Sequence, residues 1–271
     1  MFGIIDFAMS IYELKILFDL DPKSKSKILN RYAKKFYLGY FFVDSEDGHC
    51  YLLDKYGEEK DVSLVYKINE NMIPKDIKKI VIPNNVTSIG YGTFYKCYNF
   101  INMTIPNSVT SIKAQAFEGC DGLTSVAIPD SVTSIGYEAF CGCGRLESVT
   151  ISNNITNIME YTFYCCNALT RVVIPDSVIS IRKWAFAECS ELTNVTISNS
   201  ARSIGSSAFC NCIGLKNVII PASVTNIASW AFYGCDNLKS LVFKGKTIDQ
   251  IKAMLNYPFG IKNISIIKAE A

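Results

Sequence analysis

A block of 23 residues repeats along this chain without an insertion or a deletion. A phenylalanine and, three residues later, a cysteine mark each of seven copies. The marker residues are Phe94, Phe117, Phe140, Phe163, Phe186, Phe209 and Phe232, with Cys97, Cys120, Cys143, Cys166, Cys189, Cys212 and Cys235. Self-similarity at a period of roughly 20 to 50 residues is typical of stacked arrays, in which each unit packs against its neighbours. The period therefore predicts a solenoid.

Each copy contains a strand pattern. In one copy, Leu123, Val126 and Ile128 are apolar, and the last four residues of this pattern alternate between small and apolar, as in a half-buried strand. Pro129 ends the strand because it has no N–H and a fixed φ. We expect the strands of successive copies to stack into one sheet.

The rest of the copy is predicted to be a short extended segment and a tight turn. Val132–Ile135 is the extended segment, and Phe140 and Cys143 lie at i, i+3, which directs both inward from one helical or 3₁₀ turn. A cysteine in phase with a core phenylalanine behaves as a small buried apolar residue. The chain has 11 cysteines, an odd number, so we expect free thiols and a reducing compartment rather than a disulfide framework.

A change in composition divides the chain near Lys79, because the N-terminal region is rich in charge and the repeats are poor in it. Solenoids expose unpaired strand edges at both ends, and those ends need covers. We therefore expect an α+β fold with three parts. They are an N-terminal α+β cap domain at residues 1–76, a solenoid of about seven units at 77–243, and a C-terminal cap of a helix and a strand at 244–271.

Local signals support both caps. In the N-terminal one, a helix is expected from Asp21-Pro22 to Gly39. A hairpin turn at Asp47-Gly48 is expected between strands at 40–43 and 49–53.

In the C-terminal cap, Thr247 and Gln250 form a capping-box pattern that begins a helix, and Pro258 ends it. Ile264–Ile267 is expected to add a last strand. The helix is predicted to bury an apolar stripe formed by Ile248, Ile251 and Leu255.

The phrase at residues 128–136, IPDSVTSIG, followed by AFCGC at 139–143, closely resembles the BspA-like, or Treponema pallidum type, leucine-rich repeats. The resemblance covers residues 77–243, and residues 243–261 resemble a C-terminal ending found on bacterial members. Members with an assigned role are commonly cell-surface proteins that bind host matrix proteins or other cells. The resemblance implies a leucine-rich-repeat solenoid that acts in protein recognition or adhesion without catalysis, with a host or matrix protein as partner.

No catalytic or cofactor pattern is present in the sequence. His49 is the single histidine and lies beside the expected hairpin turn, and the cysteine pairs Cys141/Cys143 and Cys210/Cys212 are three units apart, too far for one metal site. A net charge of +2 gives no reason to expect nucleic acid, and no apolar run reaches the roughly 18 residues of a membrane span. We expect no enzyme, cofactor, metal, nucleic acid or membrane insertion, and the oligomeric state stays open.

Residues 1–20 lack the basic start and the cleavage site of a signal peptide. This favours an alternative role as a structural scaffold or virus-particle component, located inside a cell or in a particle. The family resemblance implies the cell surface instead.

Two surfaces are candidates for protein binding. The first is the free face of the strands. The alternative is that this face is simply exposed to solvent and its residues are selected for β propensity. Its candidate residues are Asn102, Thr104, Ser125, Ser148, Thr150, Arg171, Asn194, Thr196 and Asn217, together with Ala127, Val173, Ile219, Ser240 and Val242.

The second candidate surface is the position two residues before each core phenylalanine. Because this position accepts glycine, glutamate and tryptophan, we expect it to be exposed. Its occupants are Gly92, Gln115, Glu138, Tyr161, Trp184, Ser207 and Trp230. Tyr161, Trp184 and Trp230 are predicted protein-binding anchors, with Tyr164 and Tyr233 on the same side, and the alternative is that these rings pack on neighbouring turns.

Overall fold

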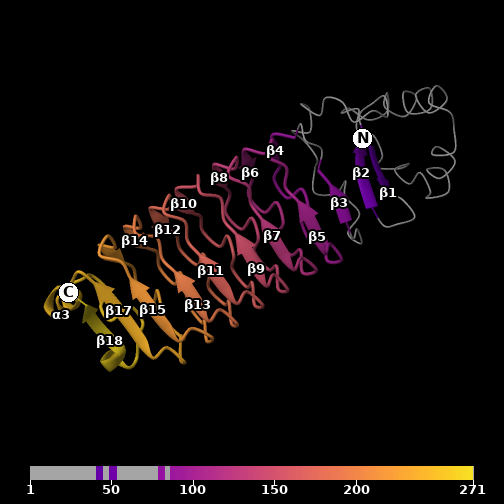
Figure 1. Cartoon of the computed structure of the whole chain (residues 1–271). Helices are drawn as coiled ribbons and strands as arrows, with labels where there is room; N and C mark the ends of the chain where they lie inside the picture. The colour runs from indigo at the N-terminus through magenta and orange to yellow at the C-terminus, as the bar shows by residue number, and fades with distance from the viewer. Residues whose placement is uncertain (1–40, 45–48, 54–78, 83–85, 271) are drawn as a thin grey trace, which may run out of the picture.

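The computed structural model describes residues 41–44, 49–53, 79–82 and 86–270. In it, successive turns of the chain stack into one elongated solenoid, with the longer strands along one face and short strands along another (Figure 1). The described residues are mostly strands and turns with little helix, so the fold is a β-solenoid and the α+β class is not confirmed.

The longer strands recur every 23 residues and define about eight turns, one more than the seven expected from the phenylalanines. They are β3 (Lys79–Val81), β5 (Asn102–Thr104), β7 (Ser125–Ala127), β9 (Ser148–Thr150), β11 (Arg171–Val173), β13 (Asn194–Thr196), β15 (Asn217–Ile220) and β17 (Ser240–Lys244). These strands pair in parallel within three groups, β3-β5, β13-β11-β9-β7 and β15-β17. The register places equivalent residues of successive copies side by side, as with Val126 and Val149. The eighth turn, which begins with β17, lacks the marker phenylalanine because Leu255 lies at the corresponding position, one period after Phe232.

The second extended segment of each copy is confirmed as a two-residue strand. These strands are β4 (Ser88–Ile89), β6 (Ser111–Ile112), β8 (Ser134–Ile135), β10 (Asn157–Ile158), β12 (Ser180–Ile181), β14 (Ser203–Ile204) and β16 (Asn226–Ile227). They form two parallel sheets, β4-β6-β8 and β10-β12-β14-β16. Every turn from β3 to β17 is thus joined to its neighbours by at least one of these two lines of strand pairing.

The two strands of the expected N-terminal hairpin are present, whereas its Asp47-Gly48 turn lies outside the described residues. β1 (Phe41–Asp44) pairs antiparallel with β2 (His49–Leu53), and β2 then pairs in parallel with β3, so the hairpin extends the sheet of the solenoid. The helix expected from Asp21-Pro22 to Gly39 lies outside the described residues, and the cap-domain boundary at residue 76 stays a prediction.

The C-terminal cap begins as expected and then differs. The helix α3 (Ile248–Lys252) has the predicted capping box between Thr247 and Gln250, but it ends at Lys252, well before Pro258. Of its expected stripe only Ile251 is buried, because α3 is too short to present Leu255 to the core and Ile248 faces outward. A 3₁₀ turn, η1 (Ile264–Ile266), takes up most of the expected strand, and β18 (Ile267–Glu270) pairs in parallel with β17.

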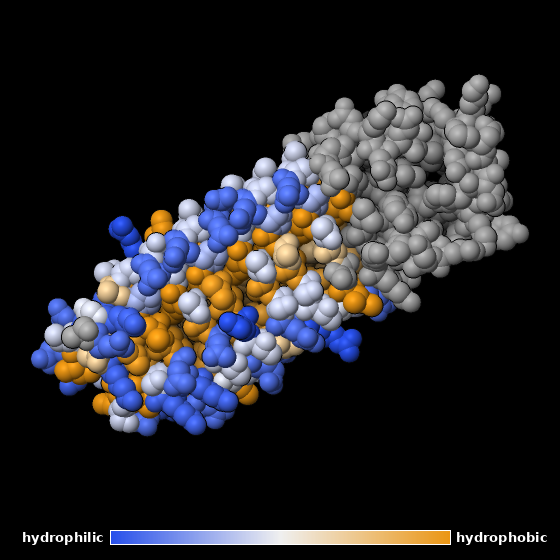
Figure 2. Space-filling model, viewed as in Figure 1, coloured by the Kyte–Doolittle hydropathy of each residue, from blue (hydrophilic) through white to orange (hydrophobic). Residues whose placement is uncertain are grey.

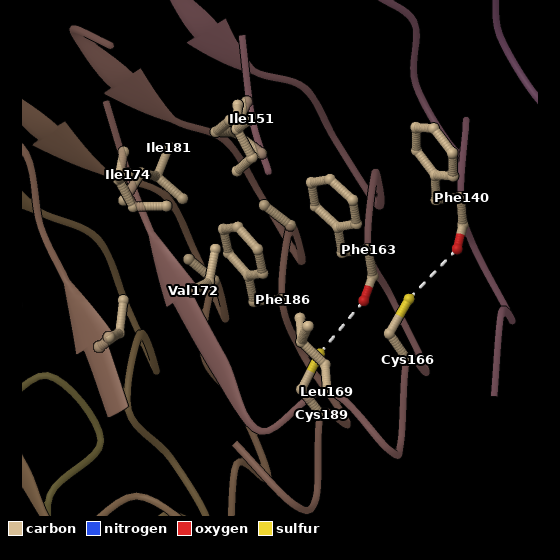
Figure 3. Close-up of a cluster of buried hydrophobic side chains, with 14 of the residues drawn as sticks. Phe140, Ile151, Phe163, Cys166, Leu169, Val172, Ile174, Ile181, Phe186 and Cys189 are labelled. Atoms are coloured by element: carbon tan, nitrogen blue, oxygen red, sulfur yellow. Dashed lines mark hydrogen bonds between the residues drawn. The ribbon is translucent and has the colours of Figure 1, made fainter. Parts of the chain in front are cut away.

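The core is a ladder of identical residues. From Phe94 to Phe232 the seven phenylalanine rings stack with centroids 4.9 to 5.5 Å apart and planes within 10° of parallel. Figure 3 shows Phe140, Phe163 and Phe186 in this stack, with Val172 and Ile174 from β11 and its end facing them. All seven rings are buried, as the period predicts.

The repeated cysteine does more than fill space. The Cys166 thiol donates to the carbonyl of Phe140 at 3.3 Å, and Cys189 donates to Phe163 at 3.2 Å (Figure 3). The same bond, 26 residues back along the chain, recurs for Cys120, Cys143, Cys212 and Cys235. The interpretation of this residue as purely apolar was therefore incomplete, although, as expected, no disulfide joins the cysteines that the structure describes.

We predict that Cys166→Ala lowers the free energy of unfolding by about 1–3 kcal/mol, because it removes buried volume and the thiol bond to the Phe140 carbonyl. Urea denaturation at pH 7 measures this loss. The control is Cys165→Ala, at a partly exposed position next in the chain, with an expected loss of less than about 1 kcal/mol. Equal losses in the two variants would contradict the structural role of the ladder thiol.

Burial also predicts how stability changes with pH. It raises the pKa of the Cys141 and Cys235 thiols from 9.0 to about 12. Since the folded-state pKa is raised, the contribution of these thiols is complete below pH 9 and is lost as the pH rises toward about 12. We expect a lower urea midpoint at alkaline pH than at neutral pH, at constant ionic strength. An unchanged or higher midpoint would show that these thiols ionise as easily in the folded chain as in the unfolded one.

Candidate functional site

The free face of the strands is exposed, as the alternation predicts. In β7, β11 and β13 the middle residue is buried and the two flanking residues face solvent. Thr104, Ser125, Ser148, Thr150, Arg171, Asn194, Thr196 and Asn217 are exposed, and the side chain of Asn102 lies outside the described residues. Val173 and Ile219 are 51% and 49% exposed, and Figure 2 shows hydrophobic residues along the middle of the molecule with hydrophilic margins. The face is therefore largely uncharged and mixed in polarity.

Side chains on this face are partly ordered by each other. Ser240 Oγ donates to Asn217 Oδ1 at 2.7 Å, and Asn194 Nδ2 donates to Thr193 Oγ1 at 3.0 Å. Such bonds reduce the rotamer freedom that a side chain loses on binding. The arrangement is rigid enough to present a fixed pattern of amide and hydroxyl groups.

The second surface has an unusual backbone, which sequence reasoning missed. All seven residues two positions before the core phenylalanine have positive φ, from 54° at Ser207 to 60° at Trp230. A second position, four residues later, is also left-handed, with Glu188 at 62° and Gly142 at 69°. The expected helical or 3₁₀ turn around Phe140 is therefore wrong, because residues of positive φ at both positions interrupt any helix. Glycine occupies several of these positions, and in the sequence it was the available signal of a positive φ.

Hydrogen bonds between turns explain why bulky residues tolerate this conformation. The N–H of Trp184 donates to Ser206 O at 3.0 Å, and that of Tyr161 donates to Lys183 O at 3.2 Å, each in the next turn. Phe163 N donates likewise to Ala185 O at 2.9 Å. The stack thereby holds the backbone of these residues in the left-handed conformation.

Three aromatic rings on this side form one group, here called the aromatic cluster: Tyr161, Tyr164 and Trp184. The Tyr161 and Trp184 rings are nearly parallel, with centroids 6.1 Å apart. Tyr164 meets both edge-on, at 5.6 and 6.0 Å. All three are half-buried.

Trp230 stands apart from the aromatic cluster. It lies two turns beyond Trp184, with the buried Ser207 at the intervening position. Its side chain is 62% exposed, and the neighbouring Tyr233 ring lies 5.9 Å from Lys262 Nζ. The three predicted anchors thus divide into a cluster containing Tyr161 and Trp184 and a separate exposed tryptophan.

Polar groups border the aromatic cluster. Asn211 Nδ2 donates to Glu188 Oε1 at 2.6 Å, and Gln115 Nε2 donates to Glu138 Oε2 at 2.7 Å. A hydrogen bond with Cys165 and burial raise the pKa of Tyr164 to about 12, so its hydroxyl stays protonated at neutral pH. The cluster therefore combines apolar rings with neutral and anionic hydrogen-bonding groups.

Among the described residues, no group of three or more histidine, cysteine, aspartate or glutamate side chains is arranged to hold a metal ion. Cys143 and Cys212, from the two cysteine pairs, donate to Phe117 O and Phe186 O in the core. Within the same part of the chain, no helix has the length and apolar character of a membrane span.

Residues 71–193 and 156–270 match the family model of the BspA type leucine rich repeat region. A search of curated proteins found no match.

Solved leucine-rich repeat proteins share the fold. One from Bacteroides ovatus is 33% identical with a TM-score of 0.59, over 72% of this chain and 46% of its own. One from Eubacterium ventriosum is 30% identical with a TM-score of 0.55, over 57% of this chain and 42% of its own. A T. pallidum protein is 26% identical with a TM-score of 0.51, over 76% and 84%. The chain thus spans less than half the length of the first two.

Trp184 and Trp230 are a matched pair for testing the surface, because both have the same left-handed backbone. We predict that Trp184→Ala costs about 1–3 kcal/mol of unfolding free energy, since the indole is half-buried against Tyr161. Trp230→Ala should cost less than about 1 kcal/mol. Urea denaturation of both soluble variants checks this. Failure of Trp230→Ala to fold would place that ring in the core instead.

Proposed function

We propose that this chain, which belongs to the BspA-type leucine-rich repeat family, is a non-enzymatic protein-interaction module that acts in recognition or adhesion. The observation that carries the proposal is the aromatic cluster on a rigid backbone, beside a separate exposed tryptophan. The resemblance to adhesive members of the family supports a host or matrix protein as partner.

The aromatic cluster is suited to be an anchor. Tyrosine and tryptophan offer large contact areas for few rotatable bonds and are enriched among the residues that dominate binding energy. Here the stack of Tyr161 on Trp184 and the edge contact of Tyr164 already restrict the rings. Little conformational entropy is left to lose on binding.

The strand face supplies the larger contact area in this proposal. Its exposed Ser, Thr and Asn side chains offer hydrogen bonds, while Val173 and Ile219 provide apolar contacts. Arg171 is the one charged residue among the candidate positions on this face. Because arginine is enriched at protein interfaces, we assign it a role in orienting the partner.

The test is binding of the full chain to a panel of purified extracellular-matrix proteins, measured by surface plasmon resonance. Trp184→Ala and Arg171→Glu should each weaken the responding interaction by about tenfold or more, as expected for residues that dominate an interface. Tyr137→Ala is the matched control, since Tyr137 is an exposed aromatic residue, 46% accessible, on the same side outside the cluster. It should leave binding unchanged.

Two results would contradict this assignment. Equal binding by the wild-type chain, Trp184→Ala and Arg171→Glu would exclude both surfaces. Binding to no matrix protein would exclude adhesion to the matrix and leave the structural-scaffold role, which cross-linking of the chain in its native setting then tests.

A further inference from the structure

The last strand of the solenoid has an edge without a partner in the described part of the chain. β18 pairs with β17 on one side and ends the sheet order β15-β17-β18 at the C-terminal end of the molecule (Figure 1). Lys268, Ala269 and Glu270 are all exposed, whereas Ile267 is buried. An exposed strand edge of this kind is a template for pairing with another strand.

The hydrogen bonds to β17 determine which backbone groups face outward. Gly245 N donates to Glu270 O at 2.7 Å, so the backbone groups of Glu270 point toward β17. Because backbone groups alternate in direction along a strand, those of Lys268 also point toward β17, whereas those of Ile267 and Ala269 point to the free edge. The Ile267 N–H is already bonded to Ile264 O. Ala269 is therefore the residue that offers both an N–H and a C=O to a new strand.

We propose that two copies of this chain associate through β18, paired antiparallel with Ala269 opposite Ala269 of the second copy. Two such residues exchange both of their backbone hydrogen bonds across a two-fold axis, as in a hydrogen-bonded antiparallel pair. The sheet β15-β17-β18 then continues into the same three strands of the second copy, and the two solenoids join end to end.

Charge complementarity favours this occupant. In the register centred on Ala269, Lys268 of each copy lies opposite Glu270 of the other, at the closely spaced non-hydrogen-bonded positions. Glu270 also lies 3.6 Å from Lys244 of its own chain, so it sits between two ammonium groups in the dimer. The Lys-Ala-Glu sequence is self-complementary about its central alanine.

The C-terminal cap also exposes apolar surface at this end. Leu255 is 78% exposed, and Ile264, in the 3₁₀ turn directly before β18, is 53% exposed. The small Ala269 side chain allows close approach at the axis. Charged residues also protect edge strands from pairing, so charge reversal distinguishes complementarity from protection.

Analytical ultracentrifugation of the full chain over a dilution series tests the proposal. The wild-type chain should form dimers, and Lys268→Glu and Glu270→Lys should each raise the dimer dissociation constant by roughly tenfold or more, since each opposes like charges twice. An equimolar mixture of these two variants should recover the dimer, because each 268 then faces an opposite charge at 270. The double variant Lys268→Glu/Glu270→Lys should dimerise more strongly than either single variant because opposite charges face each other again, although it loses the contact of residue 270 with Lys244.

Ala269→Pro is a second, charge-independent test. Proline is tolerated on an edge strand whose N–H faces outward, so this variant should keep its circular dichroism and thermal midpoint while it becomes monomeric. A wild-type chain that stays monomeric throughout, or a dimer that survives both Lys268→Glu and Ala269→Pro, would overturn the proposal. Neither result bears on the matrix-binding experiment, which uses other residues.

Discussion

The seven turns that carry the marker phenylalanine depend on the stacking of that ring on the same residue in neighbouring turns. The ring stack sets the distance between successive turns at about one strand spacing. The thiol bond from Cys166 to Phe140 O holds the turns beside the rings at the same distance. Strand pairing on the opposite face has the same spacing, so the ring stack and the sheet reinforce each other. A residue inserted into any copy would break both ladders, which explains the strict period.

The part of the fold that follows from burial was predictable from sequence. Leu123, Val126 and Ile128 indicate a strand, and the phase of Phe140 and Cys143 indicates their burial, because apolar spacing records which side chains leave water. The left-handed backbone at Trp184 was not predictable in this way, since backbone hydrogen bonds to the next turn stabilise it and leave almost any side chain acceptable. The thiol of Cys166 as a donor was hidden for a related reason: its partner is a backbone carbonyl, which has no signature in the sequence.

The candidate site shows the same division. Exposure of the strand face followed from alternation, and the neighbourhood of Tyr161 and Trp184 followed from their positions one period apart. Their near-parallel stacking and the edge contacts of Tyr164 depend on rotamers that periodicity does not specify. Trp230 has the same position in the repeat and the same φ, yet it stands alone because Ser207 interrupts the aromatic column. The order of residues at this one repeat position thus determines which aromatic rings meet on the surface.

The two ends pose a problem that the period cannot solve, because a ladder stabilises a turn only when another turn follows it. At one end the hairpin β1–β2 satisfies the edge of β3. At the other, the C-terminal cap covers the core through Phe259 and Ile251, both fully buried, and adds β18 as one more rung. Adding a strand moves the free edge outward by one position without removing it. In the proposed dimer, the self-complementary sequence of β18 lets the sheet continue across a two-fold axis.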